Sequence, residues 1–384
     1  MSDAPEKDVR GIKAPRILVM GIGSSGVRAV ASMYAINPDL KAVAIDTDAK
    51  VLESVTVERN IQVGATITRG MSAGGDIELG RQSIEHDSSN IRKQLQQVDL
   101  LVIVAGLGGG TGSGAVPVIT RIAREAGSLV LTMVSMPFAF EGKKISRIAE
   151  EALKRIRTHA DAIVRIPNER LVDRADVELP VEQAFARSHK VMKDGIFSLG
   201  RMLSSNGVCS LDFACIRTML SNCDGFCHFA GAEASGADRA KMVADSLLKH
   251  RLLNKGRLLE NAEGIIIGLT GGHDLKLAEI EKVMNRLQEK LPEDVWLNFG
   301  VAVDPSFEGR LSAIVLVAEQ WKTPLVDASR QMGLTFNRNN AQGQGELPLE
   351  TIGKGEFTYI DPTILNNQDI DVPTYIRRDI KLPR

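Results

Sequence analysis

Five glycines stand among the seven residues of Gly108–Gly114 (GGGTGSG), between an apolar run and a helical pattern. Glycine lets backbone N–H groups approach an anion closely, and the helix that follows adds the positive end of its dipole. A Walker loop has a lysine after its glycines, and this segment has none. Backbone N–H groups and a metal ion would therefore have to neutralise the negative charge of a nucleotide. A flexible turn needs only one or two glycines. The segment therefore predicts a phosphate-binding loop.

Two shorter turns offer the same chemistry. The first, Gly21-Ile22-Gly23-Ser24-Ser25-Gly26, follows an apolar strand pattern, and Asp46 stands twenty residues later at the end of the next one. This is the fingerprint of a dinucleotide site. The second, Ala73-Gly74-Gly75-Asp76, precedes a helical pattern. The carboxyl ends of parallel strands share one edge of a sheet, so all three turns can converge on one nucleotide, whereas a single NAD site would leave residues 106–114 without a role.

A parallel sheet would position these turns, and the chain alternates strand and helix patterns accordingly. The pattern predicts strands at 16–20, 41–46, 99–105, 128–135 and 162–166, and helices at 24–36, 113–126 and 144–158. A long amphipathic pattern then predicts a central helix. Beyond it we expect strands near 226–231, 263–269, 296–302 and 312–318, with helices at 237–249 and 276–290.

The predicted fold class is α/β, with a doubly wound parallel-sheet nucleotide-binding domain and a smaller α/β C-terminal domain. The nucleotide-binding domain is expected at 12–180, the central helix at 181–205 and the C-terminal domain at 206–322. Residues 1–11 are expected to form a flexible N-terminus. Residues 323–366, rich in Gly, Asn, Gln and Pro, are expected to form a linker that leads to a terminal peptide at 367–384.

Composition excludes several classes of protein. Lys and Arg number 47 against 48 Asp and Glu, so no overall basic field attracts nucleic acid. No apolar run reaches the ~20 residues that cross a bilayer, and the N-terminus lacks the apolar core of a signal peptide. The four cysteines, Cys209, Cys215, Cys223 and Cys227, form no CxxC pair, which favours reduced thiols over a zinc site. We therefore expect a cytoplasmic protein.

The glycine-rich loop resembles the signature of the tubulin/FtsZ superfamily, and most of the chain is similar to bacterial FtsZ, as a divergent member. The resemblance extends over about residues 12 to 320 and resumes at DIDVPTYIRRD near the end. Its motifs stand in the family's order: IDTDA at 45–49, AGG at 73–75, MPFAFEG at 136–142, IPNERL at 166–171, AF at 184–185, LDFACIRTMLSN at 211–222, GAEASGADRA at 231–240 and LTGGHDL at 269–275.

The resemblance implies a cytoskeletal GTPase that binds GTP or GDP, with Mg²⁺, and polymerises head to tail with copies of itself. The next subunit's loop would complete the hydrolytic site, so that activity exists only in the polymer. Such filaments act at the division site in the cytoplasm, and residues 367–384 would dock membrane-tethering division proteins. The family's nucleotide contacts fall on Gly21, Gly23, Ser24, Ser25, Gly26, Arg28, Asp46, Ala73, Gly74, Gly75, Gly108, Gly109, Gly110, Thr111, Gly112, Pro137, Glu141, Asn168, Phe185 and His189.

The residues expected to face the sugar and the base depart most from the family's pattern. Glu141 matches a ribose contact, and Asn168 and Phe185 match sugar and base contacts; without the resemblance Phe185 would be assigned to helix packing. Arg28 stands where the family has Asn, Ile145 where it has Arg, and His189 where it has Asp or Asn. A carboxylate accepts two guanine N–H groups, whereas neutral histidine accepts one and protonated histidine none. The loss predicts guanine selectivity weakened by about 1–3 kcal/mol.

The predicted catalytic loop departs from the family as well. Asp212 keeps the first acidic position, but Cys215 replaces the second and Ser210 stands at the family's Asn. A thiol is mostly neutral at pH 7 and polarises water poorly, so we expect hydrolysis roughly 10- to 1000-fold slower than with both acids. Two alternatives remain: a non-hydrolysing or altered-nucleotide filament paralogue, and, more remotely, an NAD-binding Rossmann enzyme.

Overall fold

The computed structural model describes residues 15–172, 180–204, 211–223, 225–318 and 320, together with two short strands. Those strands, β11 (Ile364–Leu365) and β12 (Gln368–Asp369), pair antiparallel and belong to a separate unit that begins at Leu325. The predicted N-terminus at 1–11 lies outside the described residues. So do the predicted linker at 323–366 and the terminal peptide at 367–384, apart from those four strand residues.

A ten-stranded sheet forms the centre of the unit Met1–Pro324, in the order β3-β2-β1-β4-β5-β6-β7-β10-β8-β9. All of these strands run in one direction except β10, which is antiparallel to both of its neighbours. The strands are β1 (Ile17–Ile22), β2 (Ala42–Asp46), β3 (Arg59–Gln62), β4 (Leu100–Gly106), β5 (Leu129–Met136), β6 (Ala162–Pro167), β7 (Gly225–Ser235), β8 (Gly264–Gly271), β9 (Trp296–Val303) and β10 (Arg310–Ala318).

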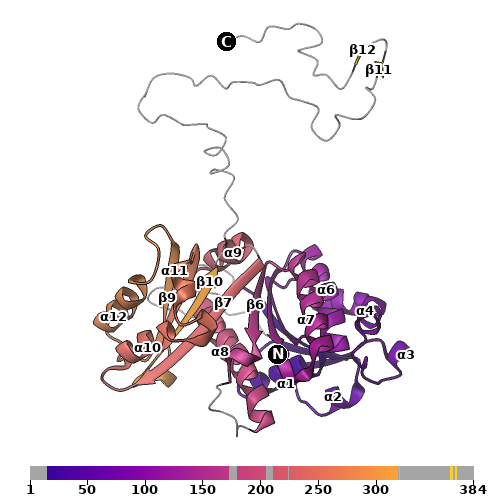
Figure 1. Ribbon diagram of the computed structural model, residues 1–384, viewed down its shortest axis with the longest axis horizontal. Coiled ribbons are helices and arrows are strands. Elements are labelled where there is room, and N and C mark those ends of the chain that lie inside the picture. The colour runs from indigo at the N-terminus through magenta and orange to yellow at the C-terminus, as the bar shows by residue number, and fades with distance from the viewer. Residues whose placement is uncertain are drawn as a thin grey trace, which may run out of the picture. The chain divides into compact units, whose positions relative to one another are not determined.

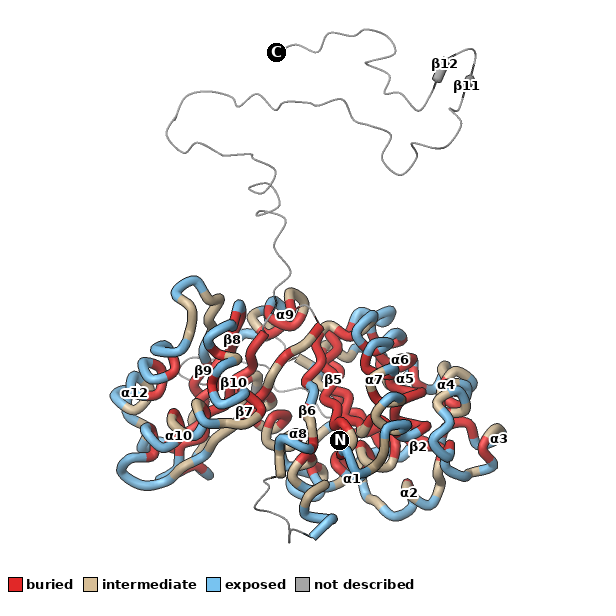
Figure 2. The backbone as a smooth tube through the Cα atoms, viewed as in Figure 1, coloured by how far each residue is buried: buried red, intermediate tan, exposed pale blue. Residues whose placement is uncertain are grey.

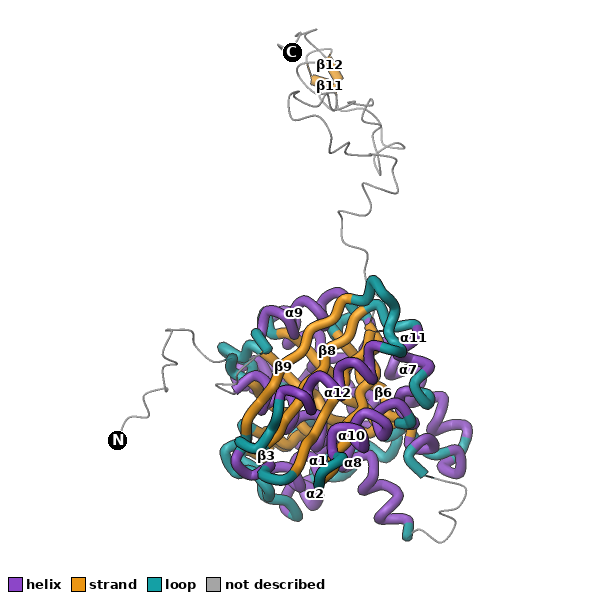
Figure 3. The backbone as a smooth tube through the Cα atoms, turned by 90° about the vertical axis from the view of Figure 1, so that its left-hand side faces the viewer, coloured by secondary structure: helices purple, strands orange, loops and turns teal. Residues whose placement is uncertain are grey.

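Helices lie on both faces of this sheet (Figures 1 and 3). The α-helices are α1 (Gly23–Tyr34), α2 (Ala49–Glu53), α3 (Ala65–Thr68), α4 (Ile77–His86), α5 (Ser88–Gln94), α6 (Gly110–Glu125), α7 (Lys143–Arg157), α8 (Val181–Ser204), α9 (Phe213–Asn222), α10 (Arg239–Leu248), α11 (Arg257–Glu260) and α12 (Leu277–Gln288). Short 3-10 turns are η1 (Ala139–Glu141), η2 (Asn168–Arg170), η3 (Arg251–Leu253) and η4 (Pro305–Phe307).

The central strands are apolar along their whole length because both of their faces are covered. Every residue of β5 is buried, as Figure 2 shows, and so are the first six residues of β4. Alternate residues point to opposite faces, so Met20 packs in the cluster beneath α4–α7 while Val19 packs in the cluster beneath α1 and α8. The predicted doubly wound α/β architecture is confirmed.

The C-terminal half continues the same sheet. β7 pairs with β6 at its first residues, from Ala162↔Gly225 to Val164↔Cys227, so no break separates the two halves. The central helix α8 packs Ile196 and Met202 in a core shared by residues of both halves, including Val164 and Ile266. On the opposite face α10 and α12 cover β8 and β10 (Figure 3). A sequence pattern of two successive α/β segments does not reveal that their sheets are joined.

Candidate functional site

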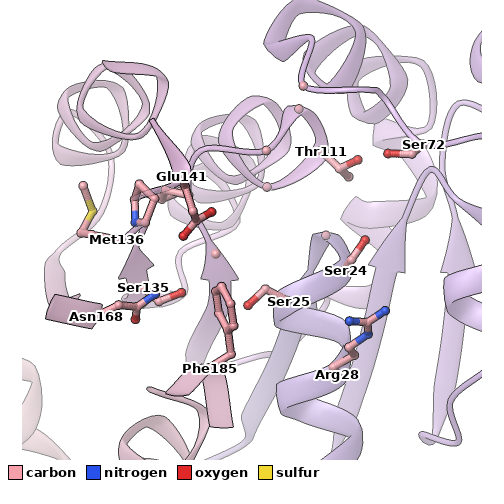
Figure 4. A pocket seen from close by; sticks show the side chains of 18 of the residues that line it. Ser24, Ser25, Arg28, Ser72, Thr111, Ser135, Met136, Glu141, Asn168 and Phe185 are labelled. Carbon is pink, nitrogen blue, oxygen red and sulfur yellow. The ribbon is translucent and has the colours of Figure 1, made fainter. Parts of the chain in front are cut away.

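A pocket of about 400 Å³ opens at the carboxyl ends of β1, β4, β5 and β6. This is the edge where open α/β sheets bind ligands, and the volume suits a nucleotide. In Figure 4, Ser24, Ser25 and Arg28 follow one another on α1, across the pocket from Ser135, Glu141 and Asn168. The lining residues are Gly23, Ser24, Ser25, Arg28, Ser72, Gly75, Gly106, Leu107, Gly109, Gly110, Thr111, Gly112, Ser135, Met136, Pro137, Glu141, Asn168, Phe185 and His189.

Two helices begin at the pocket without a side-chain cap. α1 follows Ile22 and α6 follows Gly109, and neither preceding side chain accepts a hydrogen bond from the first turn. The first backbone N–H groups of both helices therefore remain available for an anion, aided by two helix dipoles. The two starts touch, because a Cβ added at Gly23 would lie 3.0 Å from the Gly112 nitrogen. The arrangement suits a phosphate group held by backbone N–H groups.

The third predicted turn packs against the second. A Cβ on Gly110 would lie 2.7 Å from the Asp76 carbonyl oxygen and 2.9 Å from the Ala73 Cβ. The Asp76 carboxylate caps α4 by accepting the N–H groups of Glu78 and Leu79, at 2.8 and 3.2 Å. It is therefore committed to the helix, and the open positions of this turn are Gly74 and Gly75, whose φ values are +58° and +83°.

A close approach of α4 to α6 fixes this turn, and no sequence pattern predicts it. A Cβ on Gly80 would lie 2.3 Å from the Gly110 carbonyl oxygen, and one on Gly114 would lie 2.3 Å from the Ile77 carbonyl oxygen. The two helices therefore meet backbone to backbone, and only glycine fits at both contacts. In the sequence Gly80 is an isolated glycine inside a helical pattern, which ordinarily only lowers helix propensity.

One wall of the pocket carries polar groups of the kind that hold a sugar. The Asn168 side chain is 3% exposed, and its Oδ1 has no hydrogen-bond partner among the described residues. A buried acceptor without a partner is costly, so this oxygen is ready for a ligand hydroxyl. Glu141 Oε1 accepts the Phe138 N–H at 2.8 Å, and this hydrogen bond holds the carboxylate in the same wall of the pocket. Phe185 meets the Phe138 ring edge-on, with the centroids 5.2 Å apart.

The opposite wall brings together α1 and α8. Ser25 Oγ and His189 Nε2 lie 3.2 Å apart although 164 residues separate them in the chain. Burial, and next the charge of Arg28, lower the pKa of His189 below its usual 6.5. The imidazole is therefore neutral at pH 7, with a donor on one ring nitrogen and an acceptor on the other. The wall formed by α1 and α8 contributes no carboxylate to the pocket lining, since Glu141 belongs to the other wall.

Fourteen of the twenty predicted nucleotide residues line the pocket, and six do not. Asp46 is 1% exposed and accepts the hydroxyl of Ser24 at 3.0 Å and the N–H of Thr47 at 2.7 Å. It positions Ser24 and is not aimed at a ribose, which disfavours the NAD site. Gly108 donates its N–H to Ser113 Oγ at 2.9 Å and so stabilises the conformation of the loop without lining the pocket. The other four residues outside the lining are Gly21, Gly26, Ala73 and Gly74.

Five lining residues were not among the predicted nucleotide contacts. Ser135 and Met136 end β5, Gly106 ends β4 and Leu107 follows it, so the carboxyl end of each strand was the available signal. Ser72 precedes the third turn directly.

The two residues predicted to be catalytic lie away from the pocket. Asp212 is exposed at the start of α9, where its Oδ1 accepts the Ala214 N–H at 3.2 Å, and Cys215 is partly buried one turn later. α9 leads into β7, whose first residue pairs with Ala162, the first residue of β6. α9 therefore lies at the amino edge of the parallel strands, whereas the pocket lies at their carboxyl edge. Asp212 cannot reach a nucleotide bound to its own chain.

Neither a protein metal centre nor a membrane helix is found in the part of the chain that the structure describes. Within it, no three His, Cys, Asp or Glu side chains gather to hold a metal ion. No described helix has the length and apolar content needed to cross a bilayer.

Comparison with known families and structures yields two matched segments. Residues 16–176 match the GTPase domain of the tubulin/FtsZ family, and residues 225–320 match the C-terminal domain of the FtsZ family. The chain is similar to an empty FtsZ dimer from M. jannaschii, with 29% identity and a TM-score of 0.74 over 81% of this chain and 89% of that one. It also shares the fold of a GTPγS-bound CetZ2 protofilament from Haloferax volcanii, with 20% identity and a TM-score of 0.65 over 83% and 97%.

Proposed function

Because this chain belongs to the FtsZ family, we propose that it binds GTP at the edge of its sheet and polymerises head to tail into filaments for cell division. In this proposal the nucleotide phosphates lie on the starts of α1 and α6, and its ribose lies against Glu141 and Asn168. Phe185 stacks near the base.

The observation that carries the proposal is the separation of the two half-sites. The pocket lies at the carboxyl edge of the sheet and Asp212 at the amino edge. Stacking copies in one orientation would bring the Asp212 of one subunit to the nucleotide of the next. Such a contact does not close on itself and extends into a filament. Hydrolysis of the nucleotide would then depend on assembly.

Mg²⁺ fits this site only together with the nucleotide. The pocket lining has one carboxylate, Glu141, which is bound to backbone, and the described chain holds no cluster of metal-binding side chains. Mg²⁺ commonly binds through phosphate oxygens and water with few protein ligands. When bound, it would neutralise charge on the phosphates, while the starts of α1 and α6, Glu141 and Asn168 would bind and orient the nucleotide.

We further propose that guanine selectivity is relaxed and hydrolysis is slow. Neutral His189, already within 3.2 Å of Ser25, cannot accept both N–H groups of a guanine edge. Cys215 supplies a thiol where a second carboxylate would polarise water. We expect comparable affinities for GTP and ATP, and a strong preference for GTP in equilibrium binding would contradict this. The alternative that Cys215 favours is a filament-forming paralogue that does not hydrolyse its nucleotide.

Complementation between two variants tests the shared site. Gly109→Asp places a carboxylate in open space at the start of α6, where it caps the helix and repels phosphate. Asp212→Asn keeps the pocket and removes the acid. We expect each variant alone to release no phosphate, and their mixture to release it at contacts between the two kinds of subunit. If the mixture stays as inactive as its components, Asp212 does not act on a neighbouring subunit.

Light scattering beside phosphate release distinguishes the remaining candidates. Nucleotide-dependent scattering with phosphate release supports the GTPase, and scattering without release supports the paralogue. Absence of both signals, with GTP and with ATP, would contradict both candidates.

We also infer that residues 367–384 dock a membrane-tethering protein. All but two of them lie outside the described residues. Their deletion should leave assembly intact and abolish that binding.

A further inference from the structure

Two cysteines lie sulfur to sulfur on the side of the sheet that carries α9, far from the nucleotide pocket. Cys223 follows the last residue of α9, and Cys227 lies within β7. Their Sγ atoms are 3.1 Å apart, and the two side chains are 0% and 1% exposed. A disulfide bond is about 2 Å long, so the two sulfurs need to approach by only about 1 Å.

The approach has to come from Cys223, because the strand of Cys227 is held on both sides. Cys227 stands in register with Val164 of β6 and with Ala318 of β10. Cys223 belongs to a single β-bridge and not to either ladder, and it directly follows α9. Its N–H donates to the Met219 carbonyl at 2.9 Å, and its thiol donates to the Phe226 carbonyl at 3.1 Å. Closing the gap would draw the last turn of α9 toward the sheet.

We propose that Cys223 and Cys227 are a redox-active dithiol that hydrogen peroxide converts reversibly into a disulfide, tying the end of α9 to β7. The Cys223 sulfur, which accepts the thiol hydrogen of Cys227, attacks a peroxide oxygen as the thiolate. The O–O bond breaks, hydroxide leaves and takes up the Cys223 proton as water, and Cys223 becomes a sulfenic acid. The Cys227 sulfur then attacks Cys223, the S–O bond breaks, and hydroxide leaves with the Cys227 proton as a second water.

The environment of the pair makes this a slow and selective reaction. The hydrogen bond to Cys223, together with burial, raises the pKa of the Cys227 thiol well above its usual value. The thiolate is therefore scarce, and a bulky oxidant has no access to the buried sulfurs. Because both side chains are buried, peroxide has to reach them through a local opening at the end of α9. The second sulfur lies 3.1 Å away, so it captures the sulfenic acid before further oxidation.

Peptide mass after peroxide treatment of the full-length protein tests the pair directly. Trypsin cuts after Arg217 and Arg239, so both sulfurs stay in one peptide, 218–239, while Cys209 and Cys215 share another, 202–217. We expect the first peptide to be lighter by two hydrogens and resistant to alkylation, and to become alkylated twice after dithiothreitol. Recovery of that peptide doubly alkylated, sulfinylated or cross-linked to the second would overturn the proposal.

Two single substitutions provide matched controls. Cys215→Ser should leave the loss of two hydrogens intact, and Cys227→Ser should abolish it. If Cys227→Ser does not fold, reversal by dithiothreitol in the unaltered chain still decides the outcome. The measurement needs no nucleotide or filament, so it succeeds or fails independently of the proposed function.

Discussion

At the residue scale, the proposed phosphate contacts and the proposed base contacts are built differently. The starts of α1 and α6 offer backbone N–H groups that many sequences could supply, provided that glycine stands at the contacts. The proposed base contact and the proposed second acidic position depend on particular side chains, His189 and Cys215. Single substitutions at these two positions are therefore the most informative.

Cys215→Asp should accelerate phosphate release about 10- to 1000-fold once filaments have formed, because it restores a second carboxylate to polarise the attacking water. Position 215 is partly exposed one turn after Asp212, although Cys215 also packs against the apolar core, so equal scattering of the variant is the check that it still assembles. Cys215→Ser, which adds no charge, is the control and should leave the rate low. An unchanged rate in Cys215→Asp, measured at equal scattering, would show that Cys215 does not limit hydrolysis.

His189→Asp should raise the preference for GTP over ATP by about 1–3 kcal/mol, or about 5- to 150-fold in the ratio of dissociation constants. The carboxylate can accept two guanine N–H groups at the corner where the imidazole accepts at most one. Competition binding measures the ratio. Lys190→Gln makes the same change of one negative unit at an exposed neighbouring position, and an equal gain there would point to a general charge effect.

At the scale of elements, the contact between α4 and α6 holds the third turn against the main phosphate loop. Gly80→Ala should destabilise the protein by about 1–3 kcal/mol and weaken nucleotide binding, because its Cβ would lie 2.3 Å from the Gly110 carbonyl oxygen. Thermal unfolding and nucleotide titration measure the two effects. Gly200→Ala is the control, since a Cβ there meets nothing within 4 Å. Equal behaviour of both variants would contradict the close contact.

The sequence predicted the long elements well and the short ones poorly. β4, β5, α6 and α8 are long enough to show a continuous apolar run or a helical period. By contrast, α3 and α11 have four residues each, and three of the four residues of β3 are exposed. In the site, glycine-rich turns were visible because their chemistry is local. Tertiary packing produces the contact of Ser25 with His189, 164 residues apart in the chain. It also produces the hydrogen bond that Ser24 donates to Asp46. No local pattern encodes them.

At the scale of the whole molecule, two partly buried histidines make stability depend on pH. Burial lowers the pKa of His189 and of His250 below 6.5, and His250 Nδ1 accepts the Leu252 N–H at 3.3 Å, which only the neutral ring can do. The unfolded chain therefore binds protons first as the pH falls. The stability is fully present above pH 6.5 and is lost as the pH falls through the lower pKa values of the folded state.

Denaturant titrations at about pH 7.5 and about pH 5.5 measure this loss. The double variant His189→Asn, His250→Asn should lose less stability between the two pH values than the unaltered chain. An equal loss in both proteins would assign the acid sensitivity to other groups.

The continuous sheet has a consequence for how such a chain can be divided or recombined. β6 and β7 join the two halves, and α8 buries one side against strands of both, so the halves share a single interior. Either half expressed alone would present that interior to water and should aggregate. A chimera that exchanges one half with a relative would inherit an α8 shaped for strands it no longer meets. Over evolution, substitutions on that face of α8 must be matched on both sides at once, so the two halves are inherited as one module.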